Sequence, residues 1–341
     1  MAYRAHSACV RLPLVAAHIG LRPFSRRAET PQATDLAALR RRHEELLDRD
    51  YRNAEAGFYP KRLLFQMPVR EYLRDVPALL KEIASMMGRA RTGRVRDLPV
   101  DVDLGRYPDY FRRNFHWQTD GYLSERSAAV YDAGVEFLFF GTADVMRRQV
   151  IPPISEFLRR DREARGGRPR RILDVAAGTG RTLLQLAEVH PDERYTALDL
   201  SPYYTKHAER VLAGVRDVSF VIENAEKLSF RDAEFDVVTS TFLFHELPER
   251  ARRNVLSEMR RALRPGGLVV IEDAAQLVES AELRVFLENF ALAMNEPFFA
   301  NYIERPLEDL MKAAGFVNVR TMTAFLSKVV VAEAPERLTT T

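Results

Sequence analysis

Short apolar segments alternate with helical segments at regular intervals from residue 172 to residue 334. The segments with the apolar content of strands are 172–176, 195–199, 219–222, 235–240 and 268–272. Helical stretches, among them 181–189 and 249–263, stand between them. A crossover between parallel strands needs a dozen or more residues and usually contains a helix. The alternation therefore predicts a parallel α/β sheet.

The end of the chain departs from this alternation. Segments 317–326 and 327–334 both have strand character and follow each other with almost no gap. So short a connection permits only antiparallel pairing. We therefore expect a seven-stranded sheet in which five parallel strands are followed by an antiparallel hairpin.

The chain before the sheet divides into two parts. Residues 1–33 are expected to form a basic flexible tail, because positions 1–28 hold five arginines and no acid. A targeting segment is the alternative interpretation. Residues 34–158 are expected to be mainly helical. Within them, the spacing of apolar residues predicts a helix that has Asp75 as its N-cap and ends at Gly88.

A polar, glycine-containing connector at 159–171 separates the helical part from the sheet, whose domain is expected to span 165–335. The first strand ends in a turn that contains Gly178 and Gly180. A dinucleotide-binding turn would carry a third glycine where this chain has Leu183, and no phosphate-binding loop with G-x-x-x-x-G-K-[ST] is present.

Two acids accompany this turn. Asp174 lies at the end of the first strand and Asp199 at the end of the second. A carboxylate at the second position suits the hydroxyls of a ribose and would repel a ribose phosphate. Two acids without a basic phosphate-binding residue predict a nucleoside ligand that carries positive charge.

Five successive motifs resemble those of the class I S-adenosylmethionine-dependent methyltransferases, in particular the small-molecule enzymes of ubiquinone and menaquinone biosynthesis. They are DVAAGTGR, ALDLSPYY, ENAEKLSF, FDVVTSTFLFHELP and LRPGGLVVIED, in this order within about 170–335. The resemblance implies a Rossmann-like sheet and S-adenosyl-L-methionine as the cofactor. It also implies that the domain at 165–335 binds this cofactor.

The resemblance carries a cofactor site onto ten residues: Asp174, Ala176, Gly178, Thr179, Gly180, Asp199, Leu200, Asn224, Ala225 and Thr241. It implies that Asp174 faces the ammonium group of the cofactor and that Asp199 holds its ribose. Many relatives have aspartate where this chain has Asn224, which leaves the contact with the adenine amino group open.

The methyl acceptor is expected to be a small apolar or aromatic molecule that is methylated at oxygen or carbon. In related enzymes the segment before the sheet forms a lid, here about 110–150, and its Tyr122 and Tyr131 are candidate substrate residues. Phe298 and Tyr302, after the fifth strand, are further candidates. His245, beyond the fourth strand, is the candidate general base, with a packing role as the alternative.

Several other classes of function are disfavoured. The chain has a single cysteine, Cys9, and no metal site is expected. No apolar run has the length of a membrane span, so we expect a cytoplasmic enzyme without integral membrane association. Enzymes that methylate base amines usually carry an Asn/Asp-Pro-Pro-aromatic motif that is absent here. No nucleic-acid partner is therefore expected.

Three points stay open in the sequence. One alternative is an enzyme that binds S-adenosylmethionine but performs non-methylating chemistry such as cyclisation. Another is a nucleic-acid-binding methyltransferase that uses the basic arginines of residues 1–100. The oligomeric state is open as well, with a homodimer as one alternative to a monomer.

Overall fold

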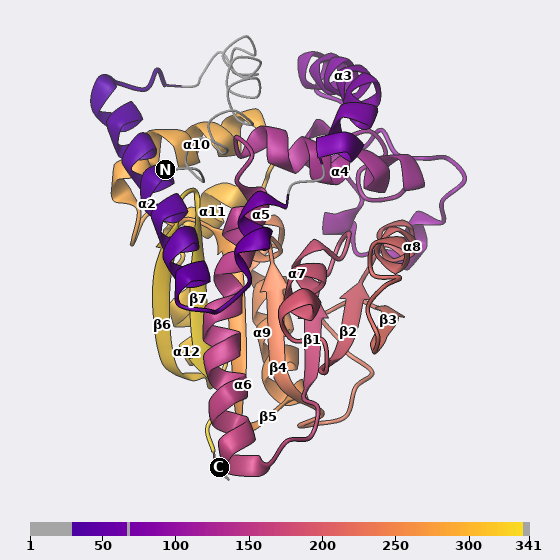
Figure 1. Cartoon of the computed structure of the whole chain (residues 1–341). Helices are drawn as coiled ribbons and strands as arrows, with labels where there is room; N and C mark the ends of the chain where they lie inside the picture. Colours follow the sequence, from indigo (N-terminus) through magenta and orange to yellow (C-terminus); the bar gives the residue numbers. More distant parts are fainter. Residues whose placement is uncertain (1–28, 67–68, 337–341) are drawn as a thin grey trace.

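A seven-stranded sheet forms the centre of the protein (Figure 1). The computed structural model describes residues 29–66 and 69–336, so nearly all of the expected basic tail lies outside the described residues. The strand order is β3-β2-β1-β4-β5-β7-β6. In chain order the strands are β1 Arg171–Val175, β2 Arg194–Asp199, β3 Val218–Ile222, β4 Phe235–Thr241, β5 Leu263–Ala274, β6 Val317–Ala324 and β7 Ser327–Glu333.

The pairing of the strands confirms the predicted architecture. Strands β1 to β5 pair in parallel, whereas β7 pairs antiparallel with both β5 and β6. All seven strands occur where the sequence predicted them. Only β5 differs appreciably, because it begins at Leu263 instead of residue 268. The expected fold class, a Rossmann-like and mostly parallel sheet with a C-terminal hairpin, is therefore confirmed.

Helices cover both faces of the sheet. The helices of the described residues are α2 Ala33–Glu55, α3 Val69–Thr92, α4 Glu125–Leu138, α5 Ala143–Arg147, α6 Ile151–Arg165, α7 Arg181–Val189, α8 Pro202–Val211, α9 Glu249–Ala262, α10 Arg284–Ala293, α11 Phe299–Glu304 and α12 Leu307–Ala313. Short 3₁₀ helices also occur, among them η3 Asp109–Phe111, η4 Phe115–Trp117 and η6 Phe244–Glu246.

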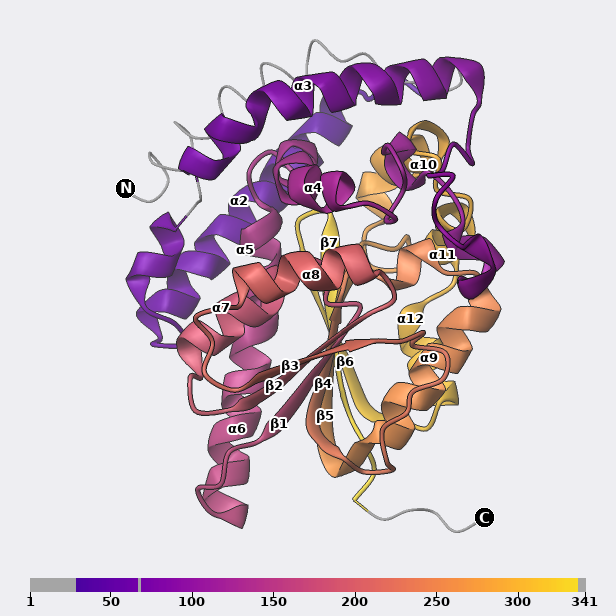
Figure 2. The ribbon, with the colours of Figure 1, turned by 90° about the vertical axis from the view of Figure 1, so that its right-hand side faces the viewer.

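Alternating residues of the parallel strands supply two apolar cores, because successive side chains of a strand point to opposite faces. Ile172 and Val237 pack with residues of α2, α6, α7 and α8. Leu173 and Val238 pack on the other side with α9, α10, α11 and α12. Figure 2 shows α6 and α7 on one side of the sheet and α9 and α12 on the other.

Helix α3 differs from its prediction. It runs continuously from Val69 to Thr92, passing through Asp75, Pro77 and Gly88. The predicted N-cap at Asp75 and the predicted end at Gly88 are therefore wrong. An interior proline costs about 3 kcal/mol through a lost hydrogen bond and a ring clash, and an interior glycine about 1 kcal/mol, and the rest of this 24-residue helix outweighs both.

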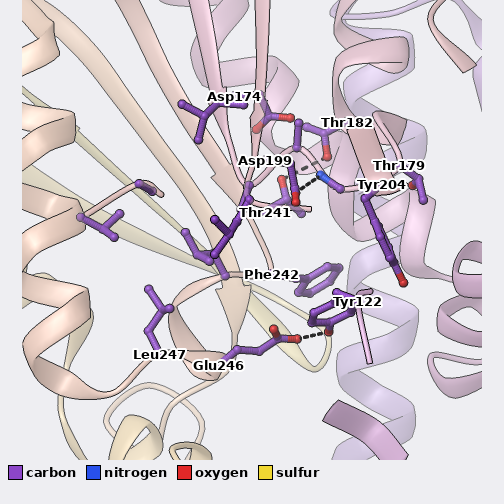
Figure 3. A pocket seen from close by; sticks show the side chains of 18 of the residues that line it. Tyr122, Asp174, Thr179, Thr182, Asp199, Tyr204, Thr241, Phe242, Glu246 and Leu247 are labelled. Atoms are coloured by element: carbon purple, nitrogen blue, oxygen red, sulfur yellow. Dashed lines mark hydrogen bonds between the residues drawn. The ribbon is translucent and has the colours of Figure 1, made fainter. Parts of the chain in front are cut away.

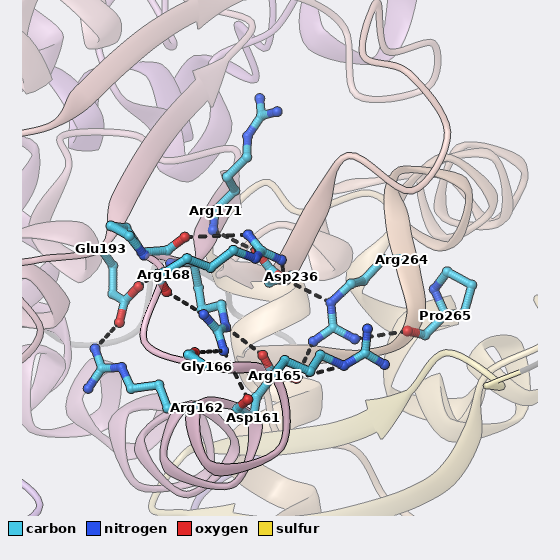
Figure 4. Close-up of polar contacts among 12 residues, drawn as sticks. Asp161, Arg162, Arg165, Gly166, Arg168, Arg171, Glu193, Asp236, Arg264 and Pro265 are labelled. Atoms are coloured by element: carbon cyan, nitrogen blue, oxygen red, sulfur yellow. Dashed lines mark hydrogen bonds and ion pairs between the residues drawn. The ribbon is translucent and has the colours of Figure 1, made fainter.

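The predicted connector at 159–171 is also shorter than expected. Helix α6 continues to Arg165, and Gly166, with φ 80°, provides its C-cap. Arg170 is fully buried, and its guanidinium donates to the carbonyl oxygens of Asp161 and Gly166, each at 2.9 Å. Figure 4 shows this polar cluster at the amino ends of the strands. Arginines that look solvated in the sequence are thus part of the packed interior.

The residues between α3 and α5 lie beyond the carboxyl ends of the parallel strands, on the side of α4 in Figure 1. They include η3, η4 and the whole of α4. We call residues 110–150 the lid region. In the part of the chain that the structure describes, no helix combines the length and the apolar character that crossing a membrane requires.

Candidate active site

A pocket opens at the carboxyl ends of β1, β2 and β4, where ligands bind in sheets of this kind (Figure 3). Its walls come from the sheet edge and from the lid region. The sheet side includes Asp174, Ala176, Gly178, Thr179, Asp199, Leu200, Asn224, Ala225 and Thr241. The lid side includes Tyr110, Phe111, Tyr122, Tyr131 and Arg147. The structure thus brings together nine of the ten cofactor residues expected from the sequence.

The glycine turn after β1 brings backbone to the pocket. Ala176 and Gly178 have φ values of 59° and 55°, and a Cβ atom built on Gly178 would meet nothing within 4 Å. Gly180, the tenth expected residue, does not line the pocket. A Cβ atom there would lie 3.0 Å from Leu212 Cδ1, so this glycine allows the turn to pack on the chain after α8.

Asp199 lies at the end of β2 and fixes the turn. Its Oδ2 accepts the N–H of Gly178 and its Oδ1 accepts the N–H of Ser201, both at 2.8 Å. Burial raises the pKa of Asp199 to about 6, although these N–H groups oppose the rise. The carboxylate is part of the pocket wall and retains lone pairs that can accept hydroxyl groups of a ligand.

Asp174 is the more deeply buried acid of the pocket. It is 1% exposed, and its Oδ1 has no hydrogen-bond partner in the described part of the chain. Burial, with the nearby charge of Asp199, raises the pKa of Asp174 well above its usual range. A buried carboxyl group of this kind stabilises a bound cation, which would also hold the carboxyl in its ionised form. The two acids therefore fit a nucleoside ligand with positive charge.

Hydrogen bonds connect the turn to neighbouring elements. Thr179 donates from Oγ1 to Asp132 Oδ1 at 2.8 Å, which joins the turn to α4 of the lid region. Thr182 at the start of α7 lies 3.1 Å from Thr241 at the end of β4, measured between the two Oγ1 atoms. These contacts hold the sheet edge and the lid region in a defined arrangement around the pocket.

Aromatic rings form the lid side of the pocket. The Tyr122 ring lies edge-on to those of Tyr131 and Tyr204, at centroid distances of 6.1 and 5.3 Å. The Tyr204 hydroxyl accepts a hydrogen bond from Gln118 Nε2 at 3.1 Å and lies 2.9 Å from Ser127 Oγ. The rings are therefore fixed by packing and by hydrogen bonds, as a preformed binding wall requires.

His245 lies next to the pocket but is not part of its wall. Its Nδ1 is 2.6 Å from Asp273 Oδ1. Burial lowers the pKa of His245, but the Asp273 carboxylate more than offsets this and raises the pKa to about 9. In this arrangement His245 is a hydrogen-bond donor at neutral pH. Glu246, the next residue, lines the pocket and accepts the Tyr122 hydroxyl at 2.5 Å.

The two candidates after β5 also lie away from this pocket. Tyr302 is buried, and its hydroxyl donates to the Ala274 carbonyl at 2.8 Å. The Phe298 ring faces the guanidinium of Arg113 at 5.5 Å. Tyr122 and Tyr131, in contrast, lie where the sequence analysis expected substrate contacts.

Sequence reasoning missed several residues of the wall, namely Tyr110, Phe111, Arg147, Thr182, Tyr204, Phe242 and Glu246. Tyr110 and Phe111 belong to the aromatic-rich segment that was expected to form the lid. Phe242 follows β4 with a φ of 58°, a strained conformation that no sequence pattern indicated. The position of Glu246 beside the candidate base His245 could have indicated a site residue. An acid near the start of a helix is common, however, so this signal is weak.

Comparison with known proteins now adds to this geometry. A methyltransferase-domain family model matches residues 172–267. The demethylmenaquinone methyltransferase of Thermotoga maritima is 34% identical over 44% of this chain and 59% of its own. The malonyl-[acyl-carrier protein] O-methyltransferase of Geobacter sulfurreducens is 38% identical over 42% of this chain and 48% of its own. The demethylmenaquinone methyltransferase of Geobacillus stearothermophilus is 30% identical, over 44% and 72% respectively.

The chain belongs to the class I S-adenosylmethionine-dependent methyltransferases of the menaquinone type. This membership confirms the family that the sequence predicted. The matches span only 59% and 48% of the first two relatives, and more than half of this chain lies outside them. The methyl acceptor of this protein is therefore a separate question.

Proposed function

We propose that this enzyme transfers a methyl group from S-adenosylmethionine to an oxygen or carbon atom of a small apolar or aromatic molecule. One observation carries the proposal, namely that a single pocket joins the buried Asp174 and the half-buried Asp199 to a wall of fixed aromatic rings. The acids suit a cationic nucleoside, and the rings suit a flat apolar acceptor. Both relatives named for demethylmenaquinone methylation agree with such an acceptor.

The residues of the sheet edge would hold the cofactor. Asp199 would accept the ribose hydroxyls, and Asp174 would face the ammonium group. Leu200, Asn224 and Ala225 would surround the adenine, with the Asn224 side chain already accepting the N–H of Glu226 at 2.9 Å. When bound, S-adenosylmethionine supplies an activated methyl group for in-line displacement by a nucleophile.

The lid region would then hold the acceptor in line and exclude water. Tyr122 and Tyr131 are the proposed contacts, because their rings lie on the lid side of the same pocket. Positioning of this kind is the main source of catalysis in a displacement reaction. His245 would influence the reaction only through its neighbour Glu246. The Glu246 carboxylate forms part of the pocket wall, whereas the His245 imidazole does not.

The test is product analysis. Purified enzyme is incubated with S-adenosylmethionine and a panel of naphthoquinols, phenols and carboxylic acids, and both products are identified by mass spectrometry. We expect S-adenosylhomocysteine together with an acceptor that has gained one methyl group. Methylthioadenosine in its place would indicate non-methylating chemistry and contradict the proposal.

A pair of variants tests the acceptor wall. Tyr131→Ala should lower turnover by about tenfold or more, because an acceptor without that ring is poorly positioned, whereas Tyr131→Phe should retain most of it. Equal activity of Tyr131→Ala and the wild type would show that the acceptor binds elsewhere. Binding of a random RNA at low salt, lost steeply as salt is added, would favour a nucleic-acid substrate instead.

A further inference from the structure

Four ligating side chains meet beside the pocket. His116 belongs to η4 of the lid region, His245 and Glu246 to η6, and Glu296 to the turn between α10 and α11. Each offers one ligand atom, and these atoms all lie within 4.8 Å of one another. Glu246 connects the group to the pocket, because its carboxylate is part of the pocket wall.

The surroundings of Glu296 indicate that a cation is missing from this cluster of four side chains. The residue is 3% exposed, and neither of its carboxylate oxygens has a hydrogen-bond partner among the described residues. His116 Nδ1 lies 3.1 Å from Glu296 Oε1, but the alignment is not that of a hydrogen bond. A buried carboxylate without hydrogen bonds is costly, and coordination of a cation is one of the ways in which proteins compensate.

The environment of His245 orients it as a ligand. Asp273 accepts the N–H groups of Leu243 and Phe244 at 3.0 and 2.6 Å, so its carboxylate is fixed as an acceptor. The imidazole must then present a proton from Nδ1 to Asp273, which leaves Nε2 for the cluster. Nε2 lies 3.9 Å from Glu246 Oε1. A carboxylate behind a histidine is the usual arrangement at protein metal sites.

His116 Nε2 lies 3.3 Å from Glu246 Oε1, within hydrogen-bond distance, and contacts of neighbouring residues fix the backbone around His116. Its φ is 51°, a conformation that a non-glycine residue adopts only when its surroundings enforce it. Next to it, Trp117 Nε1 donates to the Ala293 carbonyl at 2.7 Å. Asn295 Nδ2 donates to the Asn114 carbonyl, also at 2.7 Å. The chain around His116 is thereby tied to the turn that carries Glu296.

We propose that His116, His245, Glu246 and Glu296 bind one divalent transition-metal ion at the edge of the pocket. Two imidazoles and two carboxylates suit zinc and its neighbours in the first transition series, whereas magnesium and calcium favour all-oxygen sites. The ion would join the lid region to the sheet edge, because its ligands come from both. No metal site was expected from the sequence, where the single cysteine was the reason, and these four ligands are far apart along the chain.

The experiment measures metal binding without turnover. Tag-free, full-length enzyme is stripped with a chelator, dialysed and titrated with Zn²⁺ in competition with a chromophoric chelator. We expect one equivalent to bind with submicromolar affinity or better. Titration with Co²⁺ should give visible absorption bands of a low-coordinate site with nitrogen and oxygen ligands, which identifies the ligand types without any variant.

Three variants locate the ion. Glu296→Gln and His116→Gln should each weaken Zn²⁺ binding by at least about tenfold, and Asp273→Asn by about 10- to 100-fold through loss of the support behind His245. The matched control is Glu272→Gln. Glu272 is also buried but is not one of the four cluster residues, so its variant should bind Zn²⁺ like the wild type.

Two results would overturn the proposal. One is a stripped wild-type enzyme that takes up no Zn²⁺ and no Co²⁺ at micromolar concentrations. The other is Zn²⁺ binding that is unchanged in both Glu296→Gln and His116→Gln, which would place the ion elsewhere. S-adenosylhomocysteine binding and circular dichroism report that each variant is folded. Because no step requires turnover, failure of this proposal is distinguishable from failure of the proposed methyl transfer.

Discussion

The two ends of the parallel strands treat buried charge in opposite ways. At the amino ends, shown in Figure 4, every acid of the cluster has arginine partners. Asp236 accepts from Arg168 at 2.8 Å and from Arg264 at 2.7 Å, and Asp161 accepts from Arg170 and Arg264, both at 2.5 Å. The negative charges of these acids are therefore balanced by arginines at this end of the sheet.

At the carboxyl ends, acids are buried without such compensation. Among the described residues, Asp174, Glu272 and Glu296 each have at least one carboxylate oxygen without a hydrogen-bond partner, and burial raises the pKa of all three. Paired charges stabilise one arrangement, whereas unpaired acids weaken the fold and favour a cation when one binds. The difference indicates that the amino ends serve structure and the carboxyl ends serve ligands.

The largest effect on stability is expected when one ion pair of the arginine–acid cluster at the amino ends is removed. Arg170→Met removes a fully buried guanidinium and leaves Asp161 with one fewer partner inside the protein. We expect the free energy of unfolding to fall by about 3–5 kcal/mol, the usual cost of removing one member of a buried ion pair. Urea denaturation at pH 7 measures it.

The matched control for Arg170→Met is Arg160→Met. Arg160 lies on α6 with a side chain that is 61% exposed and 3.5 Å from Glu333. Its loss should change the free energy of unfolding by at most about 1 kcal/mol. Equal effects of the two substitutions would contradict the distinction between the buried cluster and an ordinary surface.

A smaller effect on the free energy of unfolding is expected at the unpaired acid Glu272. Replacing this acid should stabilise the protein at high pH, whereas replacing Arg170 should destabilise it. Burial raises the pKa of Glu272 from 4.5 to about 8, so the folded protein binds a proton that the unfolded chain releases. The stability from that proton is complete below pH 4.5 and is lost as the pH rises through 8. Relative to Glu272→Gln, the wild type should therefore lose about 2 kcal/mol between pH 6 and pH 8.

Denaturation midpoints of the wild type and Glu272→Gln at several pH values provide this measurement. Glutamine imitates the protonated acid. The Glu272→Gln variant should therefore fold normally and should not show the loss of stability between pH 6 and pH 8. Parallel pH profiles of the two proteins would show that Glu272 is ionised in the folded state.

The smallest effect concerns binding at the unpaired end. Asp199→Asn keeps an oxygen for one N–H of the glycine turn but removes the charge that would hold the ribose hydroxyls. We expect the affinity for S-adenosylhomocysteine to fall by about 1–2 kcal/mol, the scale of a charge-assisted hydrogen bond. Isothermal titration calorimetry measures the change, and unaltered affinity would place the ribose elsewhere.

The fold was predictable from sequence to a large extent because its signals are local. Each strand of the sheet is a short apolar segment bounded by polar residues, and the hairpin of β6 and β7 follows from their close spacing. Helix ends were less predictable. Asp75 and Gly88 carry the local signals of a helix start and end, yet α3 extends past both. Arg170 is buried because the end of α6, at Asp161 and Gly166, encloses its guanidinium, and a polar, glycine-containing segment gives no local signal of that packing.

The sheet side of the pocket was predictable for the same reason, since motifs at strand ends meet at one edge of a parallel sheet. Asp174 and Asp199 are both in its wall. The lid side of the pocket was predictable only in part. Tyr122 and Tyr131 face the pocket, but Phe298 and Tyr302 lie away from it. His116 and Glu296 approach each other only through the tertiary fold, so their meeting left no signal in the sequence.

Trp117 has a consequence for how this protein can be observed. It is the only tryptophan of the chain, it is half-buried, and its indole N–H bonds to the last residue of α10. The protein therefore carries its single tryptophan, which can be excited selectively at wavelengths where tyrosine does not absorb, at the junction between the lid region and the segment inserted after β5. Any opening of that junction would move the indole into water, and its emission would shift to longer wavelength without any label attached.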